Sequence, residues 1–474
     1  MFNLFNYSLN IIIHFLFNNS NNLLNKKAMK TKSNFKTIFT MMAVIGIGML
    51  TLASCKKDDD NGTTMPEPTA KSITQIASSD PQFSILVQAL TKADLANTLN
   101  SAGTFTVFAP TNAAFNELFA KLKVTGIDQL SAEALKPILL YHVLGSKAIS
   151  TGLSSGYVST LSPATGNRYV SLKIDVEGGV KLNNASTVTK ADVMASNGVI
   201  HVINQVLLPP TVAEIAAANS NFSTLVSAVS GAGLLPALSD PKATLTVFAP
   251  TNAAFAKLTS TPSDLKPILL YHVLGSTVYS SQVTTGYAKT LSTFQSKPMD
   301  IYLNTASGVK INNSANVVLA DVVGTNGVIH VIDNVLLPPS VVDIAISNSN
   351  FSILVSAVVK AGLAGELSKP GPFTVFAPTN EAFQKLFAAL KISGIADLTA
   401  EQLTPILLYH VVAGNNVSSG LTSGNITSLG GEKISVNVGK AVVLNNSSNV
   451  AYADVQGSNG VVHVIDQVLL PPTK

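Results

Sequence analysis

Three long segments of this 474-residue chain repeat almost the same sequence motifs in the same order. Each repeat opens with TVFAPTN(A/E)AF, continues to ILLYHV and closes with NGV(I/V)HVI followed shortly by VLLPP. The first motif spans residues 106–115, 246–255 and 374–383; the second spans 138–143, 268–273 and 406–411; the third begins at Asn197, Asn326 and Asn459. Successive ILLYHV motifs start 130 and 138 residues apart, which is the length of a domain rather than of a solenoid repeat. Each repeat is therefore long enough to bury a core of its own.

The order and separation of these motifs resemble those of the fasciclin domain family, over roughly Lys71–Pro472. The resemblance implies an α+β fold with three tandem fasciclin-like domains, each a β-sandwich or wedge with packed α-helices. It also implies roles in cell adhesion and matrix contact, without catalytic chemistry. The motif boundaries place the domains at residues 71–210, 211–339 and 340–474.

Residues 29–54 have the features of a lipoprotein signal peptide. Met29 is followed by three lysines, then by an apolar run over 38–52, and the segment ends in Leu-Ala-Ser before Cys55. This ending resembles a bacterial lipobox, in which the thiol of Cys55 would be acylated and would anchor the protein to a membrane. The alternatives are a transmembrane anchor, for which about 20 apolar residues are needed, or a free cysteine. Cys55 is the only cysteine, so no intramolecular disulfide can form.

The segments on either side of this leader lead to two further predictions. Eight of residues 1–28 are asparagine, a bias typical of AT-rich untranslated DNA, so we expect translation to start at Met29; a genuine extension of the leader is the alternative. Residues 55–70 predict a flexible tether. Its Lys/Asp run over 56–60 resembles a surface-export signal of Gram-negative lipoproteins, although a solvated charge run would look the same. We therefore expect an outer-membrane lipoprotein exposed at the cell surface.

The charge balance argues against a nucleic-acid partner. Without the first 54 residues the chain has 25 basic and 26 acidic groups, and Arg168 is its only arginine. No basic surface is therefore expected. The sequence also lacks HxH, HExxH and EF-hand patterns, so we predict neither a metal site nor a cofactor.

Six of the seven histidines recur in two sets. The first set belongs to the tyrosine–histidine motif, with the pairs Tyr141 and His142, Tyr271 and His272, and Tyr409 and His410. The family resemblance associates this motif with adhesion. The alternative is structural: a pair between apolar residues tends to be partly buried, with its polar atoms hydrogen-bonded.

The second set pairs with aspartates across a predicted hairpin. A type I′ turn at Asn197-Gly198 would place Asp192 diagonally opposite His201. The same arithmetic pairs Asp321 with His330 and Asp454 with His463. An Asp–His pair could form two-thirds of a hydrolytic triad, but no GxSxG segment accompanies it. We therefore predict structural pairs and no catalytic residue.

Local patterns predict where helices begin. Apolar residues at i, i+3, i+4 and i+7 starting from Phe83 indicate one buried helical face, with Asp80 as N-cap and Pro81 in the first turn. Asn219 and Asn348 occupy the cap position in the other repeats. Capping boxes are expected at 261–264 and 399–402.

These observations favour adhesion as the function. The partners would be cell-surface or matrix components, including polysaccharide, or other copies of the chain. Weak contacts repeated in three domains would add up through avidity. The alternatives are a glycan-binding accessory lipoprotein for nutrient uptake and a structural spacer without a ligand.

Overall fold

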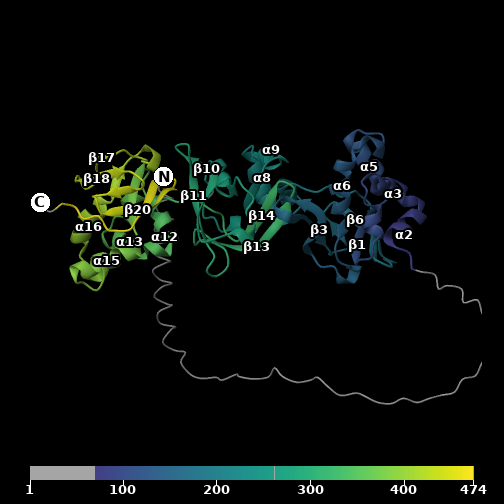
Figure 1. Ribbon diagram of the computed structural model, residues 1–474, viewed down its shortest axis with the longest axis horizontal. Coiled ribbons are helices and arrows are strands. Elements are labelled where there is room, and N and C mark those ends of the chain that lie inside the picture. The colour runs from purple at the N-terminus through teal and green to yellow at the C-terminus, as the bar shows by residue number, and fades with distance from the viewer. Residues whose placement is uncertain (1–69, 261, 473–474) are drawn as a thin grey trace, which may run out of the picture. The chain divides into compact units, whose positions relative to one another are not determined.

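The computed structural model describes residues 70–260 and 262–472. The predictions for the leader, Cys55 and the tether lie outside these residues. Lys71–Lys474 form one compact unit, in which each repeat folds into helices and a seven-stranded sheet (Figure 1). The α+β class predicted from the motifs is confirmed.

Domain 1 shows the arrangement that the other two domains repeat. Its helices are α2 (Ile73–Ser79), α3 (Ser84–Lys92), α4 (Ala96–Asn100), α5 (Asn112–Leu122) and α6 (Ala132–Tyr141). Its strands are β1 (Phe105–Pro110), β2 (Val143–Leu144), β3 (Gly156–Ala164), β4 (Arg168–Asp175), β5 (Lys181–Leu182), β6 (Ser186–Ala195) and β7 (Gly198–Ile203). The sheet order is β2-β1-β7-β6-β5-β4-β3, with β1 parallel to β7 and the other neighbours antiparallel.

Domains 2 and 3 contain the corresponding elements. Domain 2 has helices α7 (Val212–Ala217), α8 (Ser223–Gly231), α9 (Leu235–Leu238), α10 (Asn252–Ala256) and α11 (Lys266–Tyr271), and strands β8 (Leu245–Pro250), β9 (Val273–Leu274), β10 (Gly286–Phe294), β11 (Lys297–Asn304), β12 (Lys310–Ile311), β13 (Ala315–Gly324) and β14 (Gly327–Ile332). Domain 3 has helices α12 (Val341–Ser347), α13 (Ser352–Lys360), α14 (Ala364–Leu367), α15 (Asn380–Leu390) and α16 (Ala400–Tyr409), and strands β15 (Phe373–Pro378), β16 (Val411–Ala413), β17 (Gly424–Thr427), β18 (Lys433–Val438), β19 (Val442–Leu444), β20 (Ser448–Gln456) and β21 (Gly460–Ile465).

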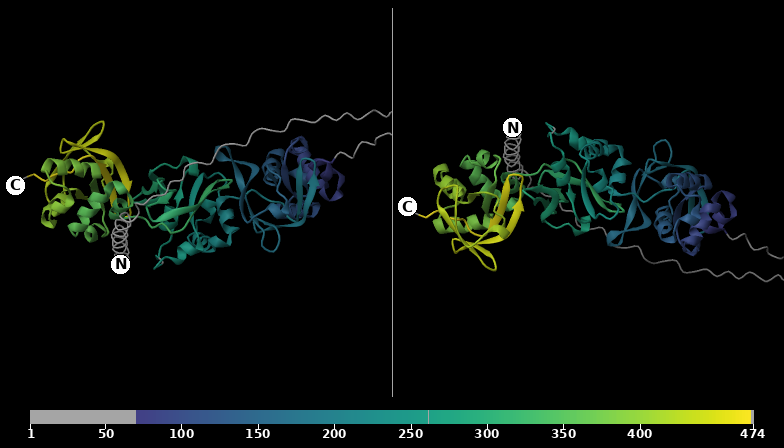
Figure 2. Two further views of the ribbon diagram at one scale, coloured as in Figure 1. Left: turned by 90° about the horizontal axis from the view of Figure 1, so that it is seen from below. Right: turned by 90° about the horizontal axis from the view of Figure 1, so that it is seen from above.

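The two faces of the central strands of domain 1 support two separate apolar clusters. Val107 and Ala109 on β1 pack with the helices, whereas Phe108 between them packs with Val170 and Leu172 of β4 on the opposite face. This division follows from the alternation of side chains along a strand. Every residue of β7 is buried, as expected for a strand covered on both faces. In the two views of Figure 2, the yellow strands of domain 3 likewise lie to one side of its green helices.

The predicted helix caps are confirmed in four of five places. Asp80, Asn219 and Asn348 accept hydrogen bonds from the backbone N–H two residues later and cap short 3₁₀ turns that precede α3, α8 and α13. Thr399 forms the expected capping box with Gln402 at the start of α16. The capping residue of the box expected at 261–264, Thr261, lies outside the described residues; α11 begins at Lys266, and its N-cap residue makes no side-chain hydrogen bond.

The predicted hairpin register is also wrong, and the asparagine of the closing motif explains why. Ala195 pairs with Gly198, so the turn residues are Ser196 and Asn197 rather than Asn197 and Gly198. The Asn197 side chain is buried; it accepts from Ile73 N at 3.0 Å and donates to the carbonyls of Leu99 and Ser101 at 2.8 and 2.9 Å. We call this arrangement the asparagine clamp.

The clamp ties the hairpin to the first and third helices of each domain. Asn326 makes the same three bonds to Val212, Leu238 and Asp240, and Asn459 does so in domain 3. The position after the asparagine requires glycine, because the neighbouring strand approaches it too closely for a side chain. A Cβ on Gly327, whose φ is +154°, would lie 2.1 Å from the carbonyl oxygen of Leu245. The Asn-Gly pair therefore serves tertiary contacts as well as the turn.

We expect Asn326→Ala to lower the free energy of unfolding of domain 2 by about 1–3 kcal/mol, because one buried N–H and two carbonyls would lose their partner. Urea denaturation of the full chain, followed by hydrogen exchange resolved by domain, measures this loss. Asn221→Ala is the matched control, since Asn221 is exposed. Equal destabilisation by both substitutions would contradict the assigned role of the clamp.

Candidate functional site

The tyrosine–histidine pairs lie in the interior of each domain. The Tyr141 hydroxyl donates to the carbonyl of Ser171 and accepts from Asn183 Nδ2, both at 2.9 Å. His142 Nδ1 lies 2.8 Å from the carbonyl of Ile138, and its Nε2 accepts from Leu207 N at 2.9 Å. Since Nε2 accepts a hydrogen bond, Nδ1 must carry the ring hydrogen and donate it to the Ile138 carbonyl.

The same bonds occur in the other two domains, and burial fixes the charge of the rings. The tyrosines and histidines of all three pairs are 0–2% exposed. Burial lowers the pKa of His142, His272 and His410 from 6.5 to about 4, so these rings are neutral near pH 7. Side chains with so little exposed area have no surface to offer a partner. This corrects the hypothesis that the motif makes adhesive contacts directly; its position instead indicates a structural role.

The Asp–His pairs form through a β-bulge rather than through the predicted hairpin register. Strand β6 has register shifts between Lys190 and Val193, and Asp192 lies there with φ of 61°. This bulge turns the backbone N–H of Asp192 toward His201 Nδ1, at 3.3 Å. The carboxylate itself is 4.0 Å from that nitrogen. Asp321 with His330 and Asp454 with His463 repeat the backbone contact at 3.4 and 3.3 Å.

The carboxylate of each pair binds a serine that the sequence did not reveal. Asp192 accepts hydrogen bonds from the backbone N–H of Ser150, at 2.8 Å, and from its hydroxyl. Ser280 binds Asp321 and Ser418 binds Asp454 in the same way. The serines lie 36–42 residues from their aspartates. No local pattern could therefore identify them, although their recurrence in all three repeats is a usable signal.

This serine–aspartate–histidine cluster has the composition of a hydrolytic triad but the wrong connections. In a triad the imidazole accepts the serine proton, whereas Ser150 bonds to Asp192. His201 Nδ1 accepts from the Asp192 backbone, so its Nε2 donates to the carbonyl of Ala148 at 2.9 Å. Both ring nitrogens are thus occupied by main-chain groups. The cluster fastens the loop before β3 to the bulge in β6.

Consecutive domains are joined by a repeated tyrosine–asparagine contact. Asn219, the cap residue before α8, donates to the Tyr157 hydroxyl of domain 1 at 3.1 Å. Tyr157 also packs against the helical cluster of domain 2. Asn348 and Tyr287 form the same 3.1 Å bond between domains 2 and 3, where Tyr287 packs against the helical cluster of domain 3. Each junction thus uses an asparagine that also begins a helix.

A second contact at each junction joins a strand of one domain to the edge of the next. Val323 N in domain 2 donates to Ser171 Oγ in domain 1, at 3.0 Å. Gln456 N in domain 3 donates to Asp300 Oδ2 in domain 2, at 2.7 Å. The two junctions therefore share their geometry and differ in the acceptor, a hydroxyl in one and a carboxylate in the other.

Comparison with known proteins agrees with this repeated architecture. The family model described as "Fasciclin domain" matches residues 81–209, 220–338 and 349–471. This chain belongs to the fasciclin domain family. It is 34% identical over 415 residues to "Transforming growth factor-beta-induced protein ig-h3" of Sus scrofa, covering 84% of this chain and 58% of that protein.

Three further proteins that resemble this fasciclin protein are matched over less of its length. Periostin of Homo sapiens is 31% identical, over 79% of this chain and 44% of periostin. "Protein sll1483" of Synechocystis is 47% identical over 133 residues, covering 28% of this chain and 74% of that protein. The solved FAS1 domain pair of the insect cell adhesion molecule Fasciclin I is 19% identical, over 53% of this chain and 95% of that one, with a TM-score of 0.34. The chain thus spans only about half the length of ig-h3 and periostin.

The third fasciclin domain differs from the first two at the positions that they use at the junctions. Asn425 occupies the position of Tyr157 and Tyr287, and its hairpin is shortened, with β17 four residues long against nine in β3 and β10. Lys433, which corresponds to Ser171 and Asp300, is exposed. Domain 3 thus has an exposed lysine at the position that is buried at both junctions.

Other kinds of site are not evident in the described residues. Over residues 70–260 and 262–472, no cluster of three or more His, Cys, Asp or Glu is arranged to hold a metal ion. Nor does any single helix in these ranges have the length and apolar composition to cross a bilayer; one bent pair, Val341–Ser347 with Ser349–Lys360, meets only those two criteria. A cavity of about 50 Å³ in domain 2 has a mainly apolar lining that includes Leu225, Val229 and Leu269, so it belongs to the core.

We expect the stability penalty of His272→Gln to shrink in acid. The pKa of His272 is about 4 in the folded domain and 6.5 in the unfolded chain. Unfolding therefore takes up a proton below pH 6.5, and the stability that wild type derives from the neutral ring is lost between about pH 6.5 and 4. The penalty should fall by up to about 1.4 kcal/mol per pH unit in that window.

Urea unfolding of both proteins at pH 7 and at pH 5 measures this change, and taking the difference between them cancels other titrating groups. A penalty that stays constant from pH 7 to pH 5 would show that His272 is not a buried neutral ring.

Proposed function

We propose that this chain is a surface-anchored adhesion protein that binds cells, matrix polymers or other copies of itself through weak contacts repeated in three fasciclin domains. The observation that carries the proposal is the pair of residue-specific junctions, which hold three domains of an adhesion-associated family at defined spacings. Fixed spacing allows several weak contacts to form on one target at little additional entropic cost.

The interior of the repeats supports binding rather than chemistry. The recurring polar groups, including the histidines and the asparagine clamp, form hydrogen bonds with main-chain groups of the same domain. Binding would then rest on the exposed faces, which differ among domains. At one equivalent strand position, for example, domain 1 has Lys190, domain 2 has Leu319 and domain 3 has Tyr452.

The amino-terminal sequence supports attachment to a membrane through Cys55. A lipid on this cysteine, followed by the tether of residues 55–70, would display the domains away from the bilayer. We place the protein at the outer face of a bacterial outer membrane, because a Lys/Asp run follows the cysteine directly.

Avidity predicts a stepwise loss of binding. Chains lacking residues 340–474, and then also 211–339, should each lose at least about tenfold in apparent affinity, because each deletion removes one contact set. Binding is measured to collagen, to a polysaccharide gel and to an immobilised layer of the chain itself. If domain 1 alone bound as tightly as all three domains, the multivalent mechanism would be excluded.

Anchoring predicts that Cys55→Ala moves the protein from the membrane fraction to the soluble fraction, because acylation requires the thiol. Detergent phase partitioning of wild type and variant tests this. Ser54→Ala, which keeps a small residue before the cysteine, is the control and should leave partitioning unchanged. Equal membrane retention of Cys55→Ala and wild type would rule out the lipid anchor.

A further inference from the structure

The junction between domains 2 and 3 contains a buried carboxylate. Asp300 is 2% exposed, and its Oδ2 accepts from Lys289 Nζ at 2.6 Å and from Gln456 N of domain 3 at 2.7 Å. Its Oδ1 is buried and has no hydrogen-bond partner. Lys289 also donates to the carbonyl of Asp454, at 2.7 Å, so it too spans the junction.

Domain 3 completes the enclosure of Asp300. The residue of domain 3 that corresponds to Asp300 and Ser171 is Lys433, which is exposed, whereas Asp300 and Ser171 are both buried. The Gln456 N–H of domain 3 covers Oδ2, so separation of domains 2 and 3 would return this carboxylate oxygen to water. Docking removes it from water and leaves one of its two oxygens unsatisfied, which is costly for an ionised group.

The junction between domains 1 and 2 provides an internal comparison. There Ser159 and Ser171 face each other across β3 and β4, in the places that Lys289 and Asp300 occupy on β10 and β11. Ser171 receives the N–H of Val323 just as Asp300 receives that of Gln456. The equivalent strand positions thus hold a neutral serine pair at the first junction and an ionisable lysine–aspartate pair at the second.

We propose that the junction between domains 2 and 3 is a proton-sensitive joint, in which protonation of Asp300 favours docking of domain 3, whereas the junction between domains 1 and 2 does not respond to pH.

The direction follows from the environment of the carboxylate. Burial raises the pKa of Asp300 from 3.8 to about 6, against the opposing effects of Lys289 and the N–H of Gln456. Separation lets the pKa of Asp300 fall toward its ordinary value of 3.8, so docking takes up a proton and strengthens as pH falls below about 7; the gain levels off near that ordinary value. From pH 7.5 to pH 5 the docking constant should rise about tenfold.

Other charged and titratable groups around Asp300 do not reverse this direction. Domain 2 contributes Lys289, Tyr271 and Tyr287, and domain 3 contributes Asp454 and Tyr452. The raised pKa values of the three tyrosines keep them neutral throughout this range, and the charge of Asp454 raises the pKa of Asp300 further. The buried histidines act oppositely, since their protonation weakens the fold in acid, so they cannot produce tighter docking.

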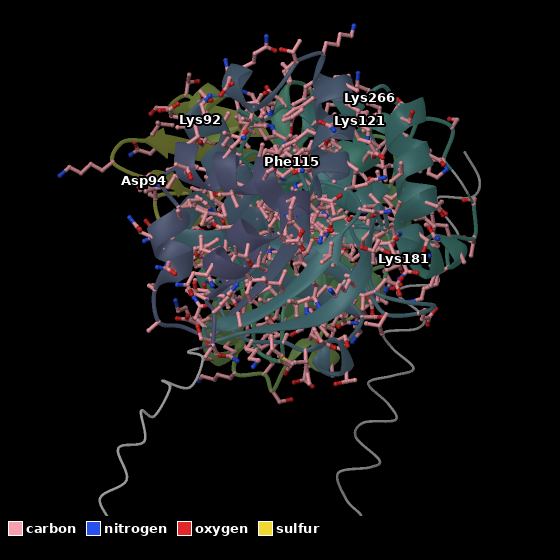
Figure 3. The ribbon with its side chains drawn as sticks, turned by 90° about the vertical axis from the view of Figure 1, so that its right-hand side faces the viewer. Lys92, Asp94, Phe115, Lys121, Lys181 and Lys266 are labelled. Carbon is pink, nitrogen blue, oxygen red and sulfur yellow. The ribbon has the colours of Figure 1, made fainter. Side chains whose placement is uncertain are left out.

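Single-molecule energy transfer in the full chain tests the proposal. With Cys55→Ser in the background, dyes on cysteines replacing Lys266 and Lys440 report the second junction; dyes at Lys121 and Lys266 report the first. All three lysines are exposed, and Figure 3 labels Lys121 and Lys266. Docked and separated populations are counted at pH 7.5 and pH 5 in urea concentrations below those that unfold the domains.

We expect docking at the second junction to strengthen about tenfold at pH 5, and docking at the first to stay constant. Asp300→Asn keeps an acceptor of the same shape but cannot titrate, so it should abolish the pH response; Asp300→Ser, which copies the first junction, should do the same. A wild-type second junction indifferent to pH would overturn the proposal. So would an equal response from the first junction or from either variant.

Discussion

The parallel pairing of the first and last motif strands is the contact on which each domain depends. In domain 1 it brings Phe108 of β1 against the His201 ring of β7, with ring centroids 5.6 Å apart. The middle motif joins them through His142, whose carbonyl accepts from Phe108 N and whose Nε2 accepts from Leu207 N. All three repeated motifs therefore meet at one buried place. A parallel pair requires a long connection, and here nearly the whole domain lies between its two strands.

This arrangement gives the most repetitive residues a structural role. The histidines, the asparagine clamp and the Asp–Ser contact each form hydrogen bonds with main-chain groups that would otherwise be buried without partners. Replacing any of them leaves an unsatisfied polar group, so all three domains retain them. What varies among domains lies at the surfaces and junctions. Differences in binding between domains must arise there.

The sequence predicted the helix starts, which depend on local hydrogen bonds. It did not predict the hairpin register or the side-chain pairs that depend on contacts between distant residues. Apolar periodicity and cap residues such as Asp80 gave the helix starts, because those bonds span only two or three residues. The hairpin register was wrong because Asn197 is held by groups near 73 and 99–101, which no turn rule includes. The Ser150–Asp192 contact and the Tyr157–Asn219 junction span 42 and 62 residues. One sequence without tertiary information gives no means of choosing such pairs.

The junctions connect this architecture to multivalent binding. Three domains on flexible linkers would sample many spacings, and each additional contact would cost the entropy of bringing its domain into place. The tyrosine–asparagine contacts and the strand-edge bonds remove much of that freedom before any ligand binds. Domain 3 has Asn425 where the first two domains have the junction tyrosine. Because the facing residues are two serines at one junction and Lys289 with Asp300 at the other, a change in pH would alter the docking of domains 2 and 3 but not that of domains 1 and 2. Avidity for a target contacted by domains 2 and 3 would then depend on pH, whereas avidity for a target contacted by domains 1 and 2 would not.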